Sequence, residues 1–394
     1  MTLTRYVGAA VCARLADEGA RVAILLLALD RTGDAALGGL LIAALMVPHV
    51  VAAPITGALA DAVHRRRLLY FLAFLGYGGA LLTGAEMIGR STVAAVVLLI
   101  FAGCCAPLLI GGLSSLLPDL VPGRLERAFG FDVMSYSIAG IAGPALAAVL
   151  ADLAGASWSV VGLVTLVVAG AILVASLPLP SADSSPKRIR SPLAGLTVMV
   201  RRPRLGAVTL GTIFSMLGVG ALPLVAALLA DEAGRHELTG LVLSAGAAGG
   251  LLTSLLLTRW PIRRWRPERV VAVSLAATVL PFLLLILLPA GWAGLPLFAL
   301  AGALGVPVSV AVFAVRDQES PPEIRTQVFT LGAGVKVTAA AAGAAVAGFA
   351  APAGIVVLLA GIAVCQALGA LAVVLVPRVT PAPEPVPSIV SQAN

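Results

Sequence analysis

Four charged residues interrupt the first long apolar stretch of the chain. They are Arg14, Asp17, Glu18 and Arg21. Steps of three, four and seven residues place all four on one face of a helix. Side chains four residues apart are neighbours on a helix, so Arg14 is expected to pair with Glu18. By the same spacing, Asp17 is expected to pair with Arg21. In a membrane such a face must look into a helix bundle or a wet cavity.

Two other polar residues lie within long apolar stretches. Lys336 is expected to meet an anionic group of a substrate, or to pair with an acid across a cavity. Its alternative is to extend to the cytoplasmic surface. His49 could titrate or bind substrate, or it could be a hydrogen-bonded packing histidine.

Metal and cofactor chemistry find no support in the sequence. The three histidines and four cysteines have no metal-ligand spacing, and no nucleophile stands with a base in a recognisable set. The cysteines lie inside apolar segments and are interpreted as packing residues. We therefore expect no cofactor, no metal and no enzymatic activity.

The composition indicates an integral membrane protein in contact with the lipid bilayer. Hydrophobic residues make up 60% of the 394 residues, charged residues only 11%, and the mean hydropathy is +1.05. A soluble protein would carry about a quarter charged residues. The net charge of +7 comes from arginines in separate short clusters, which argues against nucleic acid as a partner.

Twelve apolar runs are long enough to span a bilayer as helices. They begin near Tyr6, Ala35, Leu68, Thr92, Phe129, Ser157, Leu205, Leu238, Arg269, Trp292, Thr326 and Pro352. The predicted fold class is an all-α membrane protein with twelve transmembrane helices in two pseudo-symmetric six-helix bundles. The bundles occupy residues 1–177 and 204–376. A flexible cytoplasmic linker is predicted at 178–203 and a disordered cytoplasmic tail at 377–394.

An internal repeat supports the division into two bundles. A shift of 198 residues places Asp119 on Asp317 and Arg127 on Arg325, and it also superimposes two arginine-rich loops. Parallel repeats of six helices are typical of transporters with a substrate site between two rocking bundles.

Basic residues predict the orientation of the chain. With the amino terminus inside, twenty lysines and arginines fall in cytoplasmic segments, and only Arg31, Arg90 and Arg235 fall on the other side. This asymmetry predicts that both termini lie in the cytoplasm. The membrane is expected to be the plasma or inner membrane of the cell.

The loop that follows the second apolar run carries a motif. Residues 57–67 contain Gly57, Leu59, Asp61, Arg65 and Arg66. This segment resembles the loop signature Gly-x-Leu-Ala-Asp-Arg-x-Gly-Arg-Arg of the major facilitator superfamily, with Ala62 and His64 in place of an arginine and a glycine. The resemblance implies that Asp61 braces the start of a helix in the other half and holds a cytoplasmic gate shut. The alternative is an ordinary cluster of topology-setting arginines.

The fifth apolar run carries a second resemblance. Gly140, Gly143 and Pro144 resemble the Gly-Pro motif of antiporters in that superfamily, and close helix contact with a bend is expected there. Residues 118–128 look like the corresponding connection of bacterial drug and siderophore exporters. Asp132, near the start of the run, is expected to be a helix N-terminal acid at the gate.

The resemblance implies a role for the first helix. In the exporters an acid at the position of Asp17 contributes to proton coupling, as a carboxylate that alternates between an arginine and a proton would do. The alternative is a static network of ion pairs that only fixes helix packing. The sequence thus predicts a monomeric carrier that exports a small amphipathic compound in exchange for protons. Uptake of a nutrient or organic anion, and a membrane sensor that transports nothing, are the other interpretations.

Overall fold

The computed structural model describes residues 2–179, 191, 193–235, 237–260, 262, 264–288 and 291–375. Every regular element in these ranges is helical. The helices are α1 (Thr2–Thr32), α2 (Ala35–Ala62), α3 (Arg66–Met87), α4 (Thr92–Pro107), the π-helix η1 (Leu108–Gly112), α5 (Leu113–Ser115), α6 (Leu117–Leu120), α7 (Leu125–Ala154), α8 (Ala156–Ala175), α9 (Ala194–Arg201), α10 (Pro203–Val219), α11 (Leu222–Glu232), α12 (Glu237–Arg259), α13 (Pro267–Leu287), η2 (Trp292–Gly294), α14 (Leu295–Glu319), η3 (Pro322–Ile324), α15 (Arg325–Ala350), η4 (Ala351–Ala353) and α16 (Ile355–Leu375).

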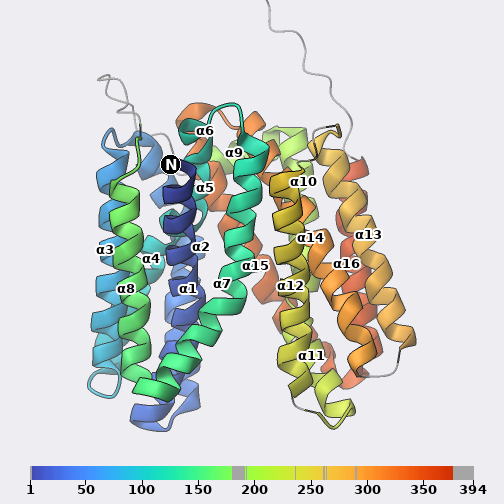
Figure 1. Ribbon diagram of the computed structural model, residues 1–394, viewed down its shortest axis with the longest axis horizontal. Helices are drawn as coiled ribbons and strands as arrows, with labels where there is room; N and C mark the ends of the chain where they lie inside the picture. The colour runs from blue at the N-terminus through green and yellow to red at the C-terminus, as the bar shows by residue number, and fades with distance from the viewer. Residues whose placement is uncertain are drawn as a thin grey trace, which may run out of the picture.

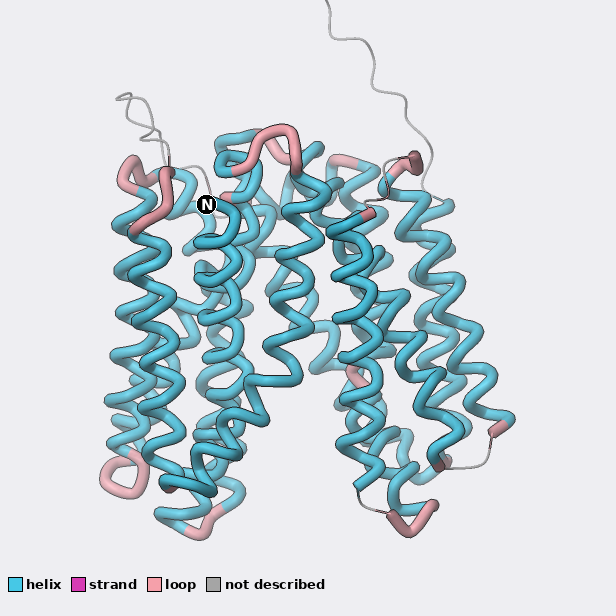
Figure 2. Tube along the Cα trace, viewed as in Figure 1, coloured by secondary structure: helices cyan, strands magenta, loops and turns pink. Residues whose placement is uncertain are grey.

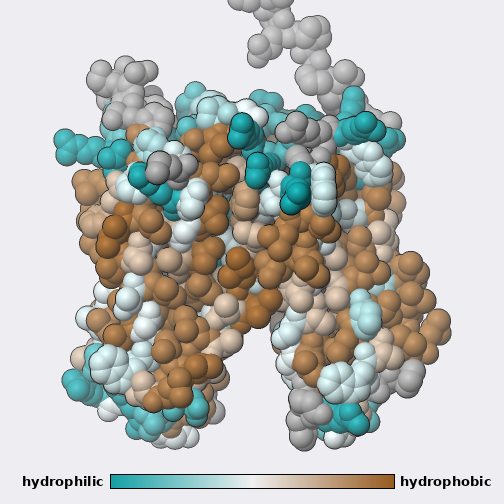
Figure 3. All heavy atoms as spheres, in the orientation of Figure 1, coloured by the Kyte–Doolittle hydropathy of each residue, from teal (hydrophilic) through white to brown (hydrophobic). Residues whose placement is uncertain are grey.

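The molecule is a multi-pass membrane protein. Within the described residues, eleven helical segments are long and apolar enough to cross a bilayer. Figure 3 shows a broad hydrophobic band around the middle and hydrophilic residues toward both ends. Helix α1 is not among the eleven, since its central charges lower its hydropathy. It nevertheless has 31 residues and packs along α7 and α8, in the same layer as the spans.

The helices fall into two groups that meet at one end (Figures 1 and 2). Helices α1 to α8 pack mainly on one another, and α10 to α14 and α16 do the same. Helix α15 joins the second group through α10 but packs most extensively on α2. The groups touch through α2 with α15 and through α7 with α12. We call the end at which α1 begins the closed end. At the other end, the open end, the surface is hollowed between the groups (Figure 3).

The predicted linker is partly helical. Helix α9 packs against α10 and α15, and the backbone N–H of Gly195 donates a 2.8 Å hydrogen bond to the Gln327 side chain. The prediction of a flexible segment throughout 178–203 is therefore wrong for residues 194–201. Residues 180–190 and 192 of that linker, and the predicted tail from 377 onward, lie outside the described residues.

Two irregular segments interrupt the spans beside the interface of the groups. After Pro107 the α-helix widens into the π-helix η1, whose Gly112 carbonyl accepts a hydrogen bond from Tyr70 at 2.9 Å. In the second group, α10 and α11 are separated at Gly220, where an added Cβ would overlap the carbonyl of Ala340. Irregular backbone at membrane depth is tolerated where protein or a cavity surrounds it.

Candidate functional site

A cavity of about 510 Å³ lies between the two groups of helices. Helices α1, α2 and α7 and η1 form its walls on one side, and helices α10 to α16 form them on the other. Most lining side chains from the second group are apolar, while the charged ones come from α1, α14 and α15. The volume suits a small organic molecule.

An acidic cluster from α1 lines the cavity. Arg21 donates to Asp17 at 3.0 Å and to Glu18 at 2.8 Å, so one guanidinium serves two carboxylates. The Tyr77 hydroxyl donates to the other oxygen of Asp17 at 3.2 Å. The predicted pairing of Asp17 with Arg21 is confirmed. The three charged residues together carry one net negative charge.

Arg14 does not pair with Glu18, and that prediction is wrong. Its guanidinium lies 2.8 Å from Asp132 on α7, and both side chains are buried. Ser114 and Tyr6 donate to Asp132, and Ser135 accepts from Arg14. Helix α7 crosses α1 at this level and presents a carboxylate directly to Arg14, which a count of residues along α1 could not reveal.

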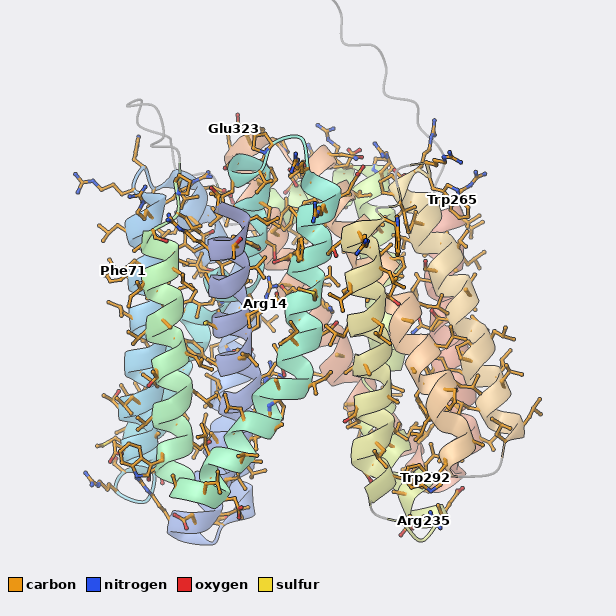
Figure 4. All side chains as sticks on the ribbon, in the orientation of Figure 1. Arg14, Phe71, Arg235, Trp265, Trp292 and Glu323 are labelled. Carbon is orange, nitrogen blue, oxygen red and sulfur yellow. The ribbon has the colours of Figure 1, made fainter. Side chains whose placement is uncertain are left out.

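Asp132 is therefore an interior ion-pair partner. Asp132 is the eighth residue of α7 and is fully buried. The prediction of a helix N-terminal acid at the gate is therefore wrong. Figure 4 labels Arg14 on α1, at the height where the α7 ribbon passes beside it. The Arg14 guanidinium also stacks 3.5 Å from the centroid of the Tyr136 ring.

Two basic residues face the cavity from the second group. Lys336 on α15 lies with its ammonium 5.7 Å from the Tyr136 ring centroid, so it does not extend to the surface. Arg316 on α14, one of the twenty basic residues predicted in cytoplasmic segments, is instead 3% exposed and lines the cavity. Neither cation has a carboxylate within 4 Å in the part of the chain that the structure describes.

Sequence reasoning missed Arg316 because it stands near the end of its apolar run. Its guanidinium lies over Gly332 of α15, where an added Cβ would overlap it. That space exists only because a glycine of another helix faces it. The Arg316 guanidinium also lies 5.8 Å from the Phe313 ring centroid.

His49 on α2 lines the cavity with 6% of its surface exposed. Its Nε2 atom has no hydrogen-bond partner in the described structure. It is close enough to Asp17 and Arg21 to interact with both electrostatically. The structure thus brings His49 to the acidic cluster, and the packing interpretation with a bonded ring nitrogen does not hold for Nε2.

An aromatic cluster closes the cavity toward the closed end. Phe313 lies 5.8 Å from both Phe129 and Phe329, and 6.5 Å from Tyr136, between ring centroids. The four rings come from α7, α14 and α15, so both groups contribute. Residues this far apart in sequence carry no local signal of such a cluster.

At the closed end Asp61 reaches across to the second group. Its two carboxylate oxygens accept the backbone N–H groups of Thr326 at 3.0 Å and Gln327 at 2.9 Å. These are unpaired donors at the start of α15, where the helix dipole favours a negative charge. The expected brace on a helix of the other half is confirmed.

Ion pairs extend this contact. Asp119 bridges Arg66 at 3.1 Å and Arg325 at 2.9 Å, and Arg325 also lies 3.4 Å from Asp317. The acids and the second arginine are members of the predicted internal repeat. Arg65, in contrast, is exposed where α3 begins.

Gly57 permits the approach of α2 to α15. A Cβ there would lie 2.6 Å from the Cα of Gln327. In α7, Gly143 has the same role against α1, since a Cβ would lie 2.9 Å from the Leu15 carbonyl. Gly140 has nothing within 4 Å, so the close contact expected there is absent. Pro144 lies inside α7, which changes direction in its lower half in Figure 1.

A helical membrane protein with a cavity between two groups of helices has the architecture typical of secondary transporters. The chain belongs to the Major Facilitator Superfamily, whose family model matches residues 7–344. An uncharacterized MFS-type transporter, y4rN of Sinorhizobium fredii (strain NBRC 101917 / NGR234), is 29% identical over 361 residues, which cover 86% of each chain.

Solved structures share the fold. A bacterial homologue of the iron transporter ferroportin, in an outward-facing state, superimposes with a TM-score of 0.74 at 16% identity, covering 95% of this chain and 98% of that one. The E. coli fucose:proton symporter FucP gives a TM-score of 0.72 at 14% identity with the same coverage. These likenesses establish the fold, and the resemblance to the superfamily is confirmed.

Proposed function

We propose that this chain is a proton-coupled secondary transporter that moves a small amphipathic compound by alternating access. The observation that carries the proposal is the cavity, which combines apolar walls with an acidic cluster of two carboxylates on one arginine. A carboxylate held by an arginine can exchange that partner for a proton as the protein changes state. Asp17 and Glu18 would carry the proton, and Arg21 would release them.

Twelve spans complete the proposed architecture, with α1 as the twelfth. Its charged face points inward, because Arg14 and Asp17 are buried against the first group of helices. Residues 1–177 and 204–376 then form two six-helix bundles. Since one chain contains the whole cavity, a monomer is sufficient for transport.

Orientation follows from the basic residues. The closed end, which holds the arginine-rich loops, would face the cytoplasm, with both termini on that side of the cell membrane. The structure would then represent an outward-open state. Asp61, Arg66 and Asp119 would hold the cytoplasmic gate shut through their contacts with α15.

The charge of the cargo sets the sense of coupling. A cationic cargo competes with protons for the carboxylates and is exchanged for them, as the resemblance to exporters predicts. An anionic cargo is attracted by a protonated, more positive cavity and moves together with protons. FucP, a symporter of the same fold, shows that this fold supports movement of a solute with protons.

Transport in liposomes tests the proposal. Purified protein would be given a pH gradient and a panel of lipophilic cations, neutral antibiotics and organic anions. We expect gradient-driven accumulation of at least one compound, lost when Asp17→Asn and Glu18→Gln are combined, while exchange of labelled for unlabelled cargo persists. Glu86→Gln, in the last turn of α3 at the open end, is the matched control.

The outcomes separate the rival functions. Accumulation that stays proton-dependent in the double variant would refute the assignment of coupling to α1. Movement without any pH dependence would indicate a facilitator. A complete absence of movement across the panel would favour the membrane sensor.

A further inference from the structure

Two cations line the cavity from the second group of helices without a carboxylate within 4 Å among the described residues. Arg316 is buried and Lys336 is half-buried. Arg316 is 3% exposed, and its Nε atom has no hydrogen-bond partner in the described structure. Lys336 is close enough to Arg316 to be repelled by it. Buried charges are ordinarily paired, because an unpaired charge in a low-polarity interior is unfavourable. A pair of like charges in one cavity is the arrangement that a bound anion would relieve.

The other charges of the cavity are already satisfied. Arg14 is paired with Asp132, and Arg21 is shared by Asp17 and Glu18. The cavity therefore has a neutral pair, an acidic cluster of net charge −1 and an uncompensated cationic pair. Only the cationic pair has no protein partner of opposite sign within 4 Å among the described residues.

We propose that Arg316 and Lys336 form an anion subsite, and that the cargo is a small organic anion with a carboxylate or sulfonate group bound there. This inference rests on the proposed transport function. The planar guanidinium suits two oxygens of such a group, and the ammonium adds a point charge. Gly332 leaves room for the guanidinium, since an added Cβ there would overlap it.

The second group of helices supplies the surface for the rest of the cargo. Val242, Leu275, Phe282 and Phe298 line the cavity on that side. Tyr136, which already carries Arg14 on its ring, closes the subsite against the first group. An amphipathic anion with one charged end and a lipophilic body fits this division.

The subsite is linked to the proton-binding carboxylates. Lys336 interacts electrostatically with Glu18 across the cavity. Protonation of Glu18 removes the negative charge that competes with the cargo for Lys336. Anion and proton therefore favour each other's binding, and linkage makes the effect reciprocal. The cargo moves together with protons, which replaces exchange by cotransport as the sense of coupling.

Other groups around the carboxylates contribute to that linkage. Arg21 lies on the same helix, Tyr77 on α3 and His49 on α2. From α7, the uncharged Gly143 lies against Glu18. Of the two cavity cations from the opposite group, Lys336 is the one that interacts with Glu18.

Equilibrium binding to protein in lipid nanodiscs tests the subsite, with empty nanodiscs as the blank. The probes are labelled arenecarboxylates of increasing size, each matched with its neutral amide and its benzylic ammonium. We expect at least one carboxylate to bind about tenfold or more tighter than its amide. Arg316→Gln or Lys336→Gln should weaken that binding by about ten- to a hundredfold.

Conservative variants and a distant control sharpen the result. Arg316→Lys and Lys336→Arg should keep part of the affinity, whereas Arg90→Gln, on an exposed loop, should change nothing. Because each cation lacks a carboxylate partner, Arg316→Met and Lys336→Met should unfold at or above the wild-type temperature without ligand, and the carboxylate should raise that temperature only in the wild type. Preference for the amide or ammonium, persistence of carboxylate binding in the double Gln variant, or binding of no carboxylate would each overturn the anion subsite.

The pH dependence of binding tests the coupling. Carboxylate affinity should rise as the pH falls from 8 to 6, by at most about tenfold per pH unit for one linked proton. Combining Asp17→Asn with Glu18→Gln should give high affinity with a flat profile. A carboxylate affinity that decreases as the pH is lowered would contradict cotransport and indicate exchange of cargo for protons. Transport of cations without carboxylate binding would refute the anion subsite and leave the proposed function intact. Carboxylate binding without any transport would support the anion subsite and refute the proposed function.

Discussion

The buried Arg14–Asp132 pair shows how single residues set the interior of this protein. Both side chains lie away from solvent, and Tyr6, Ser114 and Ser135 add hydrogen bonds to the pair. A pair of this kind need not stabilise the fold relative to two apolar residues. The loss of one partner, however, leaves an uncompensated charge inside the protein.

Asp132→Asn should therefore destabilise the protein strongly. We expect a loss of about 3–5 kcal/mol in the free energy of unfolding. Adding Arg14→Gln should recover part of this loss, because the remaining side chains are neutral and can still bond to one another. Thermal unfolding in detergent, analysed as a double-mutant cycle, measures both effects. A single variant as stable as the wild type would show that Arg14 has another counter-charge.

At the scale of elements, glycines decide how closely the helices cross. Gly143 of α7 lies against the α1 backbone beside Glu18, which sets the distance between the two helices that carry Arg14 and Asp132. Gly140 of the same helix faces open space. Both belong to one short sequence motif, so only their surroundings distinguish them.

This difference predicts contrasting effects of the same substitution. Gly143→Ala should destabilise by about 1–3 kcal/mol, since the new methyl group would lie 3.0 Å from the Glu18 Cβ and force the helices apart. Gly140→Ala should be neutral or stabilise slightly, because alanine favours the helix. Melting temperatures of the two purified variants, measured side by side, provide the check. Equal losses for both would mean that helix crossing does not depend on Gly143.

At the scale of the whole molecule, the closed end holds the two groups of helices together. Asp61 accepts the first backbone donors of α15, and Asp119 joins arginines from both groups. In the proposed alternating-access cycle, these contacts would break when that end opens. Their strength therefore contributes to the equilibrium between the two open states of a carrier.

Asp61→Ala should shift this equilibrium toward the state open at the end now closed. Loss of the helix-capping interaction is worth about 1–2 kcal/mol, or about five- to thirtyfold in the ratio of states. A cysteine introduced at Ser309, which lines the cavity, in a background without the four native cysteines reports the change. Impermeant thiol reagents should label this cysteine more from the side of the closed end and less from the side of the open end. Unchanged labelling from both sides would show that Asp61 does not stabilise the closed end.

The sequence by itself determined the class of protein and the positions of most of its membrane-spanning helices. Uniformly apolar runs require helices in lipid, and the Asp61 motif correctly predicted a contact with the start of a helix in the other half. The sequence also identified the charged face of α1, because helical periodicity is a local property. The pairing of Asp17 with Arg21 followed from that spacing alone.

Only the tertiary structure decided the partners of the other charges. Arg14 meets Asp132, and Arg316 enters the cavity over Gly332, because helices distant in sequence cross at those points. The interaction energy of two charges depends on their distance in space, and the low polarity of the interior makes this energy large. Spacing along one helix therefore predicts which face is polar, while the packing of helices determines what that face binds.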